Sequence, residues 1–554
     1  MTASVASFMR SRTGAGRRPR PPLLLVLPAL VVAIGTCLPA AYLLLRAFDA
    51  DPAQLTEIVF RQRNLYLLLN TLKLVALVLA LDTLIALPMA WLLTRSDIRA
   101  KGLLSYLMAL PLAVPGYVMA YALLGLSGYY GFARHWFGVS LPGMQGLWGA
   151  TLALSLYTFP YLFLNLRAAF MGMDPALEET ARSLGKSRLA VFRHVVLPQL
   201  WPALVASWLI VGLYVIGDFG AIALMRYEVF SYAIYTQYVG AFDRTYAAWL
   251  SLMLLALTVS ALIAQRAVTR NRRLARTGTG AARRARPVPL GRWRPLAWIF
   301  VALVALASLG LPLMVLGHWM RLGLPQMDWA QLGRTALGTL MVATPAALTA
   351  VALALPVVLL VLRWPRRWTA LIDRLAYLGY ATPSLAFALA MVFFALQTAP
   401  FLYQSFALLI FAYVMSFMAL ALGPIRLALL QIGTRQEEAA RALGASPARA
   451  FARVVLPRLR RPMVAGGLLV FIMVVKELPI TYILAPTGYG TLALNVFART
   501  NEGMMREAAP YALSIILFSS LFVGLILRYE SRGADAPDER PTTGPDTGPS
   551  TRQA

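Results

Sequence analysis

Long apolar stretches bounded by charged residues constrain this chain more than any other feature of its sequence. A helix needs about 20 mainly apolar residues to cross the roughly 30 Å hydrocarbon core of a bilayer. Hydrophobic residues make up 59% of the 554 positions and charged residues 13%. Twelve stretches qualify, at approximately 22–45, 67–93, 103–126, 146–166, 201–225, 246–265, 296–317, 336–362, 375–396, 404–425, 463–485 and 508–527. The sequence therefore predicts an all-α polytopic membrane protein with about twelve transmembrane helices.

The basic residues predict which way these spans run. With a cytoplasmic N-terminus, 39 of the 51 Lys and Arg fall in inner segments and 10 in outer loops. This asymmetry follows the positive-inside rule and predicts that both termini are cytoplasmic. The net charge of +28 could attract nucleic acid, but its distribution indicates a lipid bilayer as the partner and no nucleic acid. The first apolar run, of about 24 residues, exceeds the core of a cleaved secretion signal, which favours a retained span.

Cysteine and histidine are scarce. The single cysteine, Cys37, excludes an intramolecular disulfide. Three histidines in the whole chain disfavour a structural zinc site. We therefore expect no structural metal and no cofactor bound by this chain.

The chain contains an internal duplication. Residues 178–200 and 437–459 are identical at 13 of 23 positions at an offset of 259, and the identities include Glu, Arg, Gly, Ser and Pro. Matches upstream occur at an offset of 268 and pair Pro88 with Pro356, Arg95 with Arg363 and Pro115 with Pro383. The difference of nine residues falls between the third and fourth spans of each half, where the first half has the longer outer loop, residues 127–145. Two tandem six-helix units follow from this repeat.

The duplication and the basic segments together predict five regions. They are a basic cytoplasmic N-terminus (1–21), a first unit (22–265), an Arg-rich cytoplasmic linker (266–295), a second unit (296–530) and a disordered tail (531–554). The linker contains ten arginines and no acid over 266–294, which is typical of a flexible segment near anionic lipid headgroups.

Each unit carries the same motif in the cytoplasmic loop between its fourth and fifth spans. The motif reads Glu-x-Ala-x-x-x-Gly, nine residues, then an aliphatic, one residue and Leu-Pro. Good helix formers precede a glycine suited to a C-cap, and Leu-Pro is expected to restart a helix. The candidate residues are Glu178, Glu179, Ala181, Gly185, Leu197 and Pro198 in the first copy, and Glu437, Glu438, Ala439, Ala440, Gly444, Leu456 and Pro457 in the second.

These loops resemble the EAA motif of permease subunits of binding-protein-dependent ABC importers, although Thr180 stands where the pattern has Ala. The resemblance implies two fused permease units in a bacterial inner membrane. It also implies that each short coupling helix docks in a groove on one of two copies of an ATPase subunit, which bind the ATP and Mg. A periplasmic substrate-binding protein would be the further partner.

The chain itself is then expected to be a transport subunit and not an enzyme. The segment Gly185-Lys186-Ser187 resembles the end of a phosphate-binding loop, but Thr180 stands where that loop requires a glycine. An ion-gradient-driven 12-helix secondary transporter is the alternative class. It leaves the two cytoplasmic repeats unexplained.

Ionisable residues at membrane depth are costly and are functional candidates. Asp218 and Glu477 occupy equivalent repeat positions and would face each other across a central pathway, with Lys476 beside them. A cationic or metal-bearing substrate suits such a pair. The alternative is that Asp218 caps a kinked helix and Glu477 pairs with Lys476.

The neighbourhood of these acids resembles the fused ferric-iron permeases. The relevant segments are Asp218-Phe219-Gly220-Ala221, Lys476-Glu477-Leu478-Pro479 and residues 110–117. The resemblance implies that a periplasmic binding protein delivers ferric iron. Thiamine, phosphonate and polyamine importers share the general pattern and remain alternatives.

Overall fold

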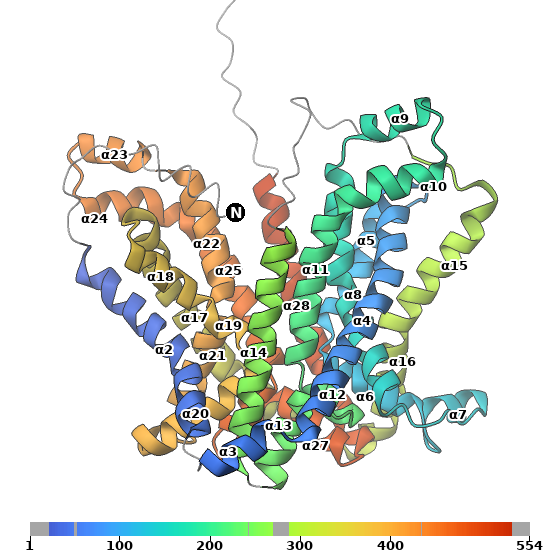
Figure 1. Ribbon diagram of the computed structural model, residues 1–554, viewed down its shortest axis with the longest axis horizontal. Helices are drawn as coiled ribbons and strands as arrows, with labels where there is room; N and C mark the ends of the chain where they lie inside the picture. Colours follow the sequence, from blue (N-terminus) through green and yellow to red (C-terminus); the bar gives the residue numbers. More distant parts are fainter. Residues whose placement is uncertain (1–20, 49–51, 242, 270–286, 434, 535–554) are drawn as a thin grey trace, which may run out of the picture.

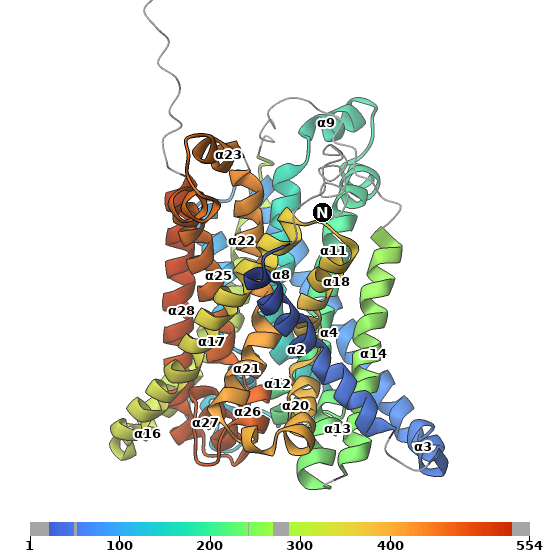
Figure 2. The ribbon, with the colours of Figure 1, turned by 90° about the vertical axis from the view of Figure 1, so that its left-hand side faces the viewer.

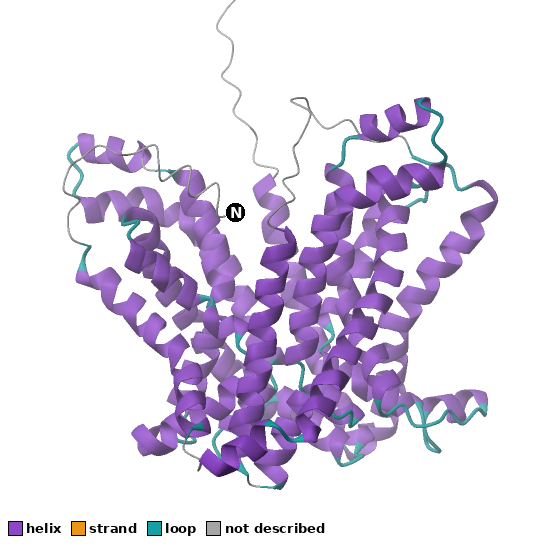
Figure 3. Ribbon diagram, viewed as in Figure 1, coloured by secondary structure: helices purple, strands orange, loops and turns teal. Residues whose placement is uncertain are grey.

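The computed structural model describes residues 21–48, 52–241, 243–269, 287–433 and 435–534. These residues form helices and contain no β-strand, apart from an isolated bridge between Ser96 and Val288 (Figure 3). The predicted all-α class is confirmed. Residues 1–20, most of the Arg-rich linker and the tail from 535 onward lie outside the described residues.

The main helices follow the predicted apolar stretches. In the first half they are α2 (Leu23–Ala47), α4 (Gln62–Arg95), α5 (Lys101–Ala109), α6 (Gly116–Leu126), α8 (Leu147–Gly172), α11 (Leu197–Gly217) and α14 (Arg244–Thr269). In the second half they are α15 (Arg294–Ala305), α16 (Leu311–Gly323), α17 (Trp329–Arg363), α18 (Arg367–Ala376), α19 (Leu378–Ala381), α20 (Ser384–Thr398), α21 (Phe406–Phe417), α22 (Ala419–Ile432), α25 (Leu456–Lys476) and α28 (Met505–Ala534).

Within the described residues, 7 continuous helices are long and apolar enough to cross a membrane, and three bent pairs raise the number to as many as 10. The predicted spans 463–485 and 508–527 fall on α25 and α28, which are helical but are not among those ten. Several charged residues lie at the two ends of α25 and lower its hydropathy. The number of twelve transmembrane spans therefore stays a prediction. Helix α28 continues to Ala534, four residues into the predicted tail.

Proline breaks some spans and not others. Pro88 and Pro356 lie inside the continuous helices α4 and α17, which neighbouring membrane helices allow. Pro115 instead precedes α6, where the third span bends by 91°, and Pro383 precedes α20, where the ninth bends by 105°. These two prolines are repeat equivalents, so the two halves share the break.

The first helix of each half packs against the other half. Helix α2 contacts α17, α18 and α20 of the second half, and α16 contacts α6 of the first half as well as α28 (Figures 1 and 2). Close approach is possible where a small residue faces a large one. Gly35 lies directly against Met415, and the Trp319 indole donates to the Gly125 carbonyl at 3.2 Å. This exchange ties the two halves into one bundle.

Candidate functional site

The two repeated loops lie at the same end of the bundle. Their short helices, α9 (Pro175–Ser183) and α23 (Arg435–Ala442), project beyond the long helices in both side views (Figures 1 and 2). Asp174 begins α9, because its side chain accepts from the Ala176 amide at 3.0 Å. Both copies thus present a short helix at one face of the molecule, as the motif predicts.

The motif glycines end these helices in the left-handed conformation. Gly185 has φ +78° and Gly444 has φ +88°. In each copy the following amide reaches back to the motif alanine, Lys186 to Ala181 at 3.2 Å and Ala445 to Ala440 at 3.1 Å. This is the hydrogen-bond pattern of a glycine C-cap, which an L side chain would strain.

The next helix begins earlier than Leu-Pro. Ser187 and Ser446 cap it in the two copies, so the predicted restart at Leu197-Pro198 and Leu456-Pro457 is wrong. A π-helical turn stands immediately before each Leu-Pro, at Phe192–Val196 and Phe451–Val455. Proline has no amide hydrogen, and the wider turn accommodates that gap in the helical hydrogen bonding.

Two leucines that the sequence reasoning missed stand out on these loops. Leu184 is 75% exposed and Leu443 is 89% exposed, and each immediately precedes its motif glycine. The second motif glutamates, Glu179 and Glu438, are also exposed. An apolar side chain held in water at equivalent positions of two repeats suits a protein contact. Their identity at matching repeat positions was the available signal.

The first motif glutamates point inward instead. Glu178 pairs with Arg95 at 3.2 Å, and Glu437 pairs with Arg363 at 2.5 Å. Arg95 and Arg363 are the last residues of α4 and α17 and are themselves repeat equivalents. Each loop is therefore linked to the second long helix of its own half by the same ion pair.

The two membrane acids also have matching local roles. Asp218 follows α11 and accepts from the amides of Ala221 at 3.0 Å and Ile222 at 3.3 Å, which begins α12 (Gly220–Met225). Glu477 follows α25 and accepts from the Ile480 amide at 3.1 Å, at the start of α26 (Pro479–Leu484). The spans expected to be continuous over 201–225 and 463–485 are thus each broken at an acid, because the carboxylate satisfies the amides of a new helix.

These acids lie where the two halves meet. Their carboxylates are close enough to interact electrostatically. Lys476 does not pair with Glu477, since its Nζ donates across the interface to the Leu112 carbonyl at 3.1 Å. A Cβ added to Gly220 would meet Leu478 of the other half at 2.9 Å. The structure therefore brings together the residues that the repeat offset related.

Two phenol groups that the sequence reasoning did not place beside the acids lie next to this pair. The Tyr157 hydroxyl donates to the second oxygen of Asp218 at 3.0 Å. Tyr117 is 4% exposed, and its hydroxyl has no hydrogen-bond partner among the described residues. Among all the residues that the structure describes, no three His, Cys, Asp or Glu side chains lie close enough together to form a metal-binding group. The interface thus offers carboxylate and phenol oxygens without a closed chelating site.

Comparison with known proteins agrees with this architecture. The family described as "Binding-protein-dependent transport system inner membrane component" matches twice, over residues 83–274 and 346–532, which confirms the internal repeat. The "Fe(3+)-transport system permease protein FbpB 2" of Haemophilus influenzae is 30% identical over 92% of this chain and 99% of its own length.

Shorter matches reach other transport permeases. The "Molybdenum transport system permease protein ModB" of Escherichia coli K12 is 35% identical over 24% of this chain and 58% of its own length. The "Sulfate transport system permease protein CysT" of Salmonella typhimurium is 30% identical over 36% of this chain and 75% of its own length. The chain therefore belongs to the inner membrane components of binding-protein-dependent transport systems, as a permease made of two repeated units.

Proposed function

We propose that this permease conducts ferric iron delivered by a periplasmic binding protein, by alternating access driven by two copies of an ATPase subunit. The observation that carries the choice of substrate is a pair of carboxylates at the junction of the two halves, the buried Glu477 and the partly buried Asp218. Carboxylate oxygens are hard ligands, which suit hard cations. Two neighbouring acids would repel sulfate or molybdate at membrane depth, where charges are poorly screened.

The full-length similarity to a ferric-iron permease supports the same choice, whereas the molybdenum and sulfate permeases match only part of the chain. A polyamine is the second candidate, because the acidic pair favours an organic cation as well. Thiamine and phosphonate stay alternatives of the wider family pattern.

Coupling is assigned to the two loops. Each would dock on one ATPase subunit, with Leu184 and Leu443 buried in the contact and the exposed Glu179 and Glu438 at its rim. ATP binding would draw the ATPase subunits together and open the pathway outward, and hydrolysis would reset it. The orientation that goes with this places both loops and both termini in the cytoplasm. ATP and Mg belong to the partner subunits.

Uptake by proteoliposomes tests the substrate. With the permease, its ATPase subunits and its ferric-binding protein reconstituted, we expect radiolabelled iron uptake that needs ATP and the binding protein and persists when an ionophore collapses the ion gradients. Putrescine, sulfate and molybdate in excess should not compete. Uptake that needs no ATPase would support the secondary transporter, and competition by an oxyanion would overturn the argument from the acidic pair.

The Arg95–Glu178 ion pair predicts a charge-reversal rescue. Arg95 is 7% exposed, and removing one partner of a buried pair costs about 3–5 kcal/mol. We expect Arg95→Glu alone to lower transport roughly tenfold or more, and Arg95→Glu with Glu178→Arg to restore it to within a few-fold. The measurement is ATPase activity stimulated by the binding protein, compared with substrate uptake in the same vesicles.

Arg61→Glu is the matched control. Arg61 pairs with Glu57 at 3.4 Å, and the two side chains are 42% and 74% exposed. Such a surface pair is worth about 0–1 kcal/mol, so transport should change little. If the double reversal is as defective as the single one, the ion pair does not link the loop to α4.

A further inference from the structure

The long outer loop of the first half belongs neither to the repeated cytoplasmic loops nor to the proposed substrate pathway. It contains α7 (Phe132–Phe137), which lies at the end of the bundle opposite α9 and projects sideways from it (Figure 1). The corresponding loop of the second half is shorter and begins with the 3₁₀ turn Pro400–Leu402. Helix α7 packs on α16, with the rings of His135 and His318 4.8 Å apart between centroids. Two of the three histidines of the chain thus meet here.

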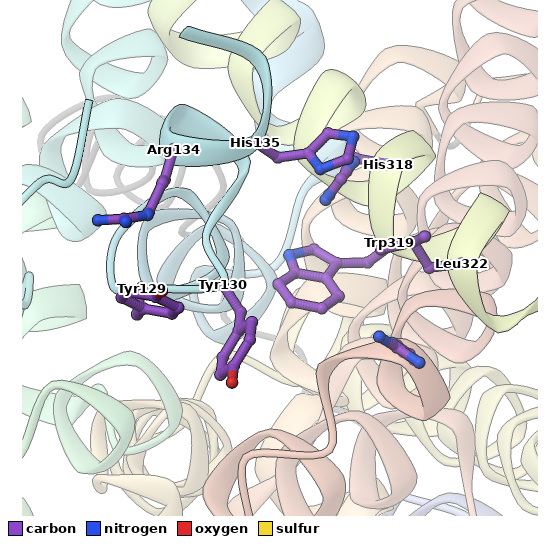
Figure 4. Close-up of a pocket in the computed structure, with 8 residues that line it drawn as sticks. Tyr129, Tyr130, Arg134, His135, His318, Trp319 and Leu322 are labelled. Atoms are coloured by element: carbon purple, nitrogen blue, oxygen red, sulfur yellow. The ribbon is translucent and has the colours of Figure 1, made fainter. Parts of the chain in front are cut away.

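A cavity of about 420 Å³ opens beside these histidines (Figure 4). Arg134 and His135 come from α7, His318 and Trp319 from α16, and Arg506 from the start of α28. None of the residues that line it is acidic. The cavity therefore joins the outer loop of the first half to the first and last helices of the second half.

A hydrogen bond determines which ring nitrogen of His318 carries the proton. The Trp136 indole, which can only donate, donates to His318 Nδ1 at 3.2 Å. A neutral imidazole that accepts at Nδ1 carries its proton on Nε2, so the other ring nitrogen is a donor. His318 is 6% exposed, and this arrangement gives the site a nearly buried N–H group.

The arginines of this site have no acidic partner. Within the described part of the chain, Arg134 and Arg506 form no ion pair, and Arg134 lies over the Tyr129 ring at 4.1 Å. The neighbouring acid Glu507 is engaged by Arg499 at 3.5 Å. Two unneutralised guanidinium groups and an N–H donor around one cavity favour an anion, above all a phosphate.

The surroundings indicate where that phosphate comes from. Trp136 is 54% exposed, Phe137 72% and Tyr130 81%. Aromatic side chains gather where a membrane protein meets the headgroup layer. Helix α7 projects sideways from the bundle (Figure 1), which places this exposed aromatic segment at the periphery of the molecule, where a membrane protein meets lipid.

We propose that this cavity binds the phosphate of an anionic phospholipid headgroup, in the outer leaflet if the coupling loops are cytoplasmic. Arg134 and Arg506 hold the charge, His318 Nε2–H donates to a phosphate oxygen, and the rings of Trp136 and Phe137 lie in the headgroup layer beside the bound lipid. The site is specific to the first half, because the second half lacks an equivalent of α7.

Lipid retention tests this site. The full chain is purified in detergent from mixed phosphatidylglycerol and phosphatidylcholine vesicles, and the retained lipid is measured by native mass spectrometry. We expect retained phosphatidylglycerol, and about 25-fold weaker retention in Arg134→Gln with Arg506→Gln, since each arginine near an anionic lipid contributes about fivefold. Arg134→Lys with Arg506→Lys should retain most of the lipid, which shows that the fold survives substitution.

Arg226→Gln with Arg334→Gln is the matched control, because both arginines are exposed, Arg226 directly after α12 and Arg334 near the start of α17, and neither lines this cavity. Its lipid retention should equal that of the wild type. Equal retention in the Arg134/Arg506 glutamine variant would overturn the proposal. Displacement of the lipid by inorganic phosphate alone would assign the cavity to a free anion, and unchanged retention with weakened docking of the binding protein would assign it to that protein's acidic side chains. Neither outcome depends on which substrate is transported.

Discussion

Replacing Gly185 and Gly444 together with valine is expected to abolish substrate uptake while leaving the chain in the membrane. Both glycines have positive φ, and nothing lies within 4 Å of a Cβ added at either. The substitution therefore acts through backbone strain, roughly 1–2 kcal/mol for each L residue held in this conformation. Because α9 and α23 project from the bundle, the strain is relieved by turning these short helices and not by unfolding the core.

Three quantities are measured: substrate uptake into vesicles, the amount of the variant chain in the membrane, and the amount of ATPase subunit that co-purifies with it. Gly102→Val with Gly423→Val is the matched control, since these glycines also have free space around an added Cβ and lie within helices at ordinary φ. It should transport at close to the wild-type rate. Normal uptake by the Gly185/Gly444 variant would mean that the loops do not drive transport through their present geometry.

Neutralising the two membrane acids is expected to lower ferric-iron uptake by about tenfold or more, a loss of about 1.4 kcal/mol or greater. Asp218→Asn and Glu477→Gln each keep an oxygen that accepts from the amides of the following helix. The double variant thus removes charge and preserves the helix starts. Stimulation of the ATPase by the binding protein should persist, because the two repeated loops, to which we assign coupling, are untouched.

Asp218→Ala separates the two roles of this residue. It removes the cap as well as the charge, and loss of a cap costs about 1 kcal/mol. We expect lower thermal stability in Asp218→Ala than in Asp218→Asn, with uptake impaired in both. If Asp218→Asn with Glu477→Gln transports iron normally, the acids serve only to begin α12 and α26.

The breaks at these acids show the limit of hydropathy. An apolar window averages over about 20 residues, so one acid barely changes it. Residues 201–225 and 463–485 consequently resemble continuous spans, although the chain is broken at Asp218 and Glu477. The repeat offset related the two acids correctly, because duplication preserves equivalent positions whatever the local backbone does.

The sequence also did not show which prolines would bend their spans. Pro88 and Pro115 both lie in predicted spans, yet only Pro115 bends its span. The local sequence does not separate these two outcomes, because a membrane helix keeps or breaks its course at a proline according to how neighbouring helices pack around it. The phenols around the acids were not connected with them for the same reason, since Tyr157 and Tyr117 lie far from Asp218 and Glu477 in the chain.

The sequence by itself determined the helical class, the duplication and the positions of both repeated loops. Each rests on local composition or on identity at a constant offset, which need no knowledge of contacts. Only the tertiary structure decided that α2 and α16 each pack against the other half. It also decided that Arg95 and Arg363 form ion pairs with the first motif glutamates and that the rings of His135 and His318 lie together. The physical reason is that these contacts join residues 74 or more positions apart in the chain, and their choice depends on how whole helices pack.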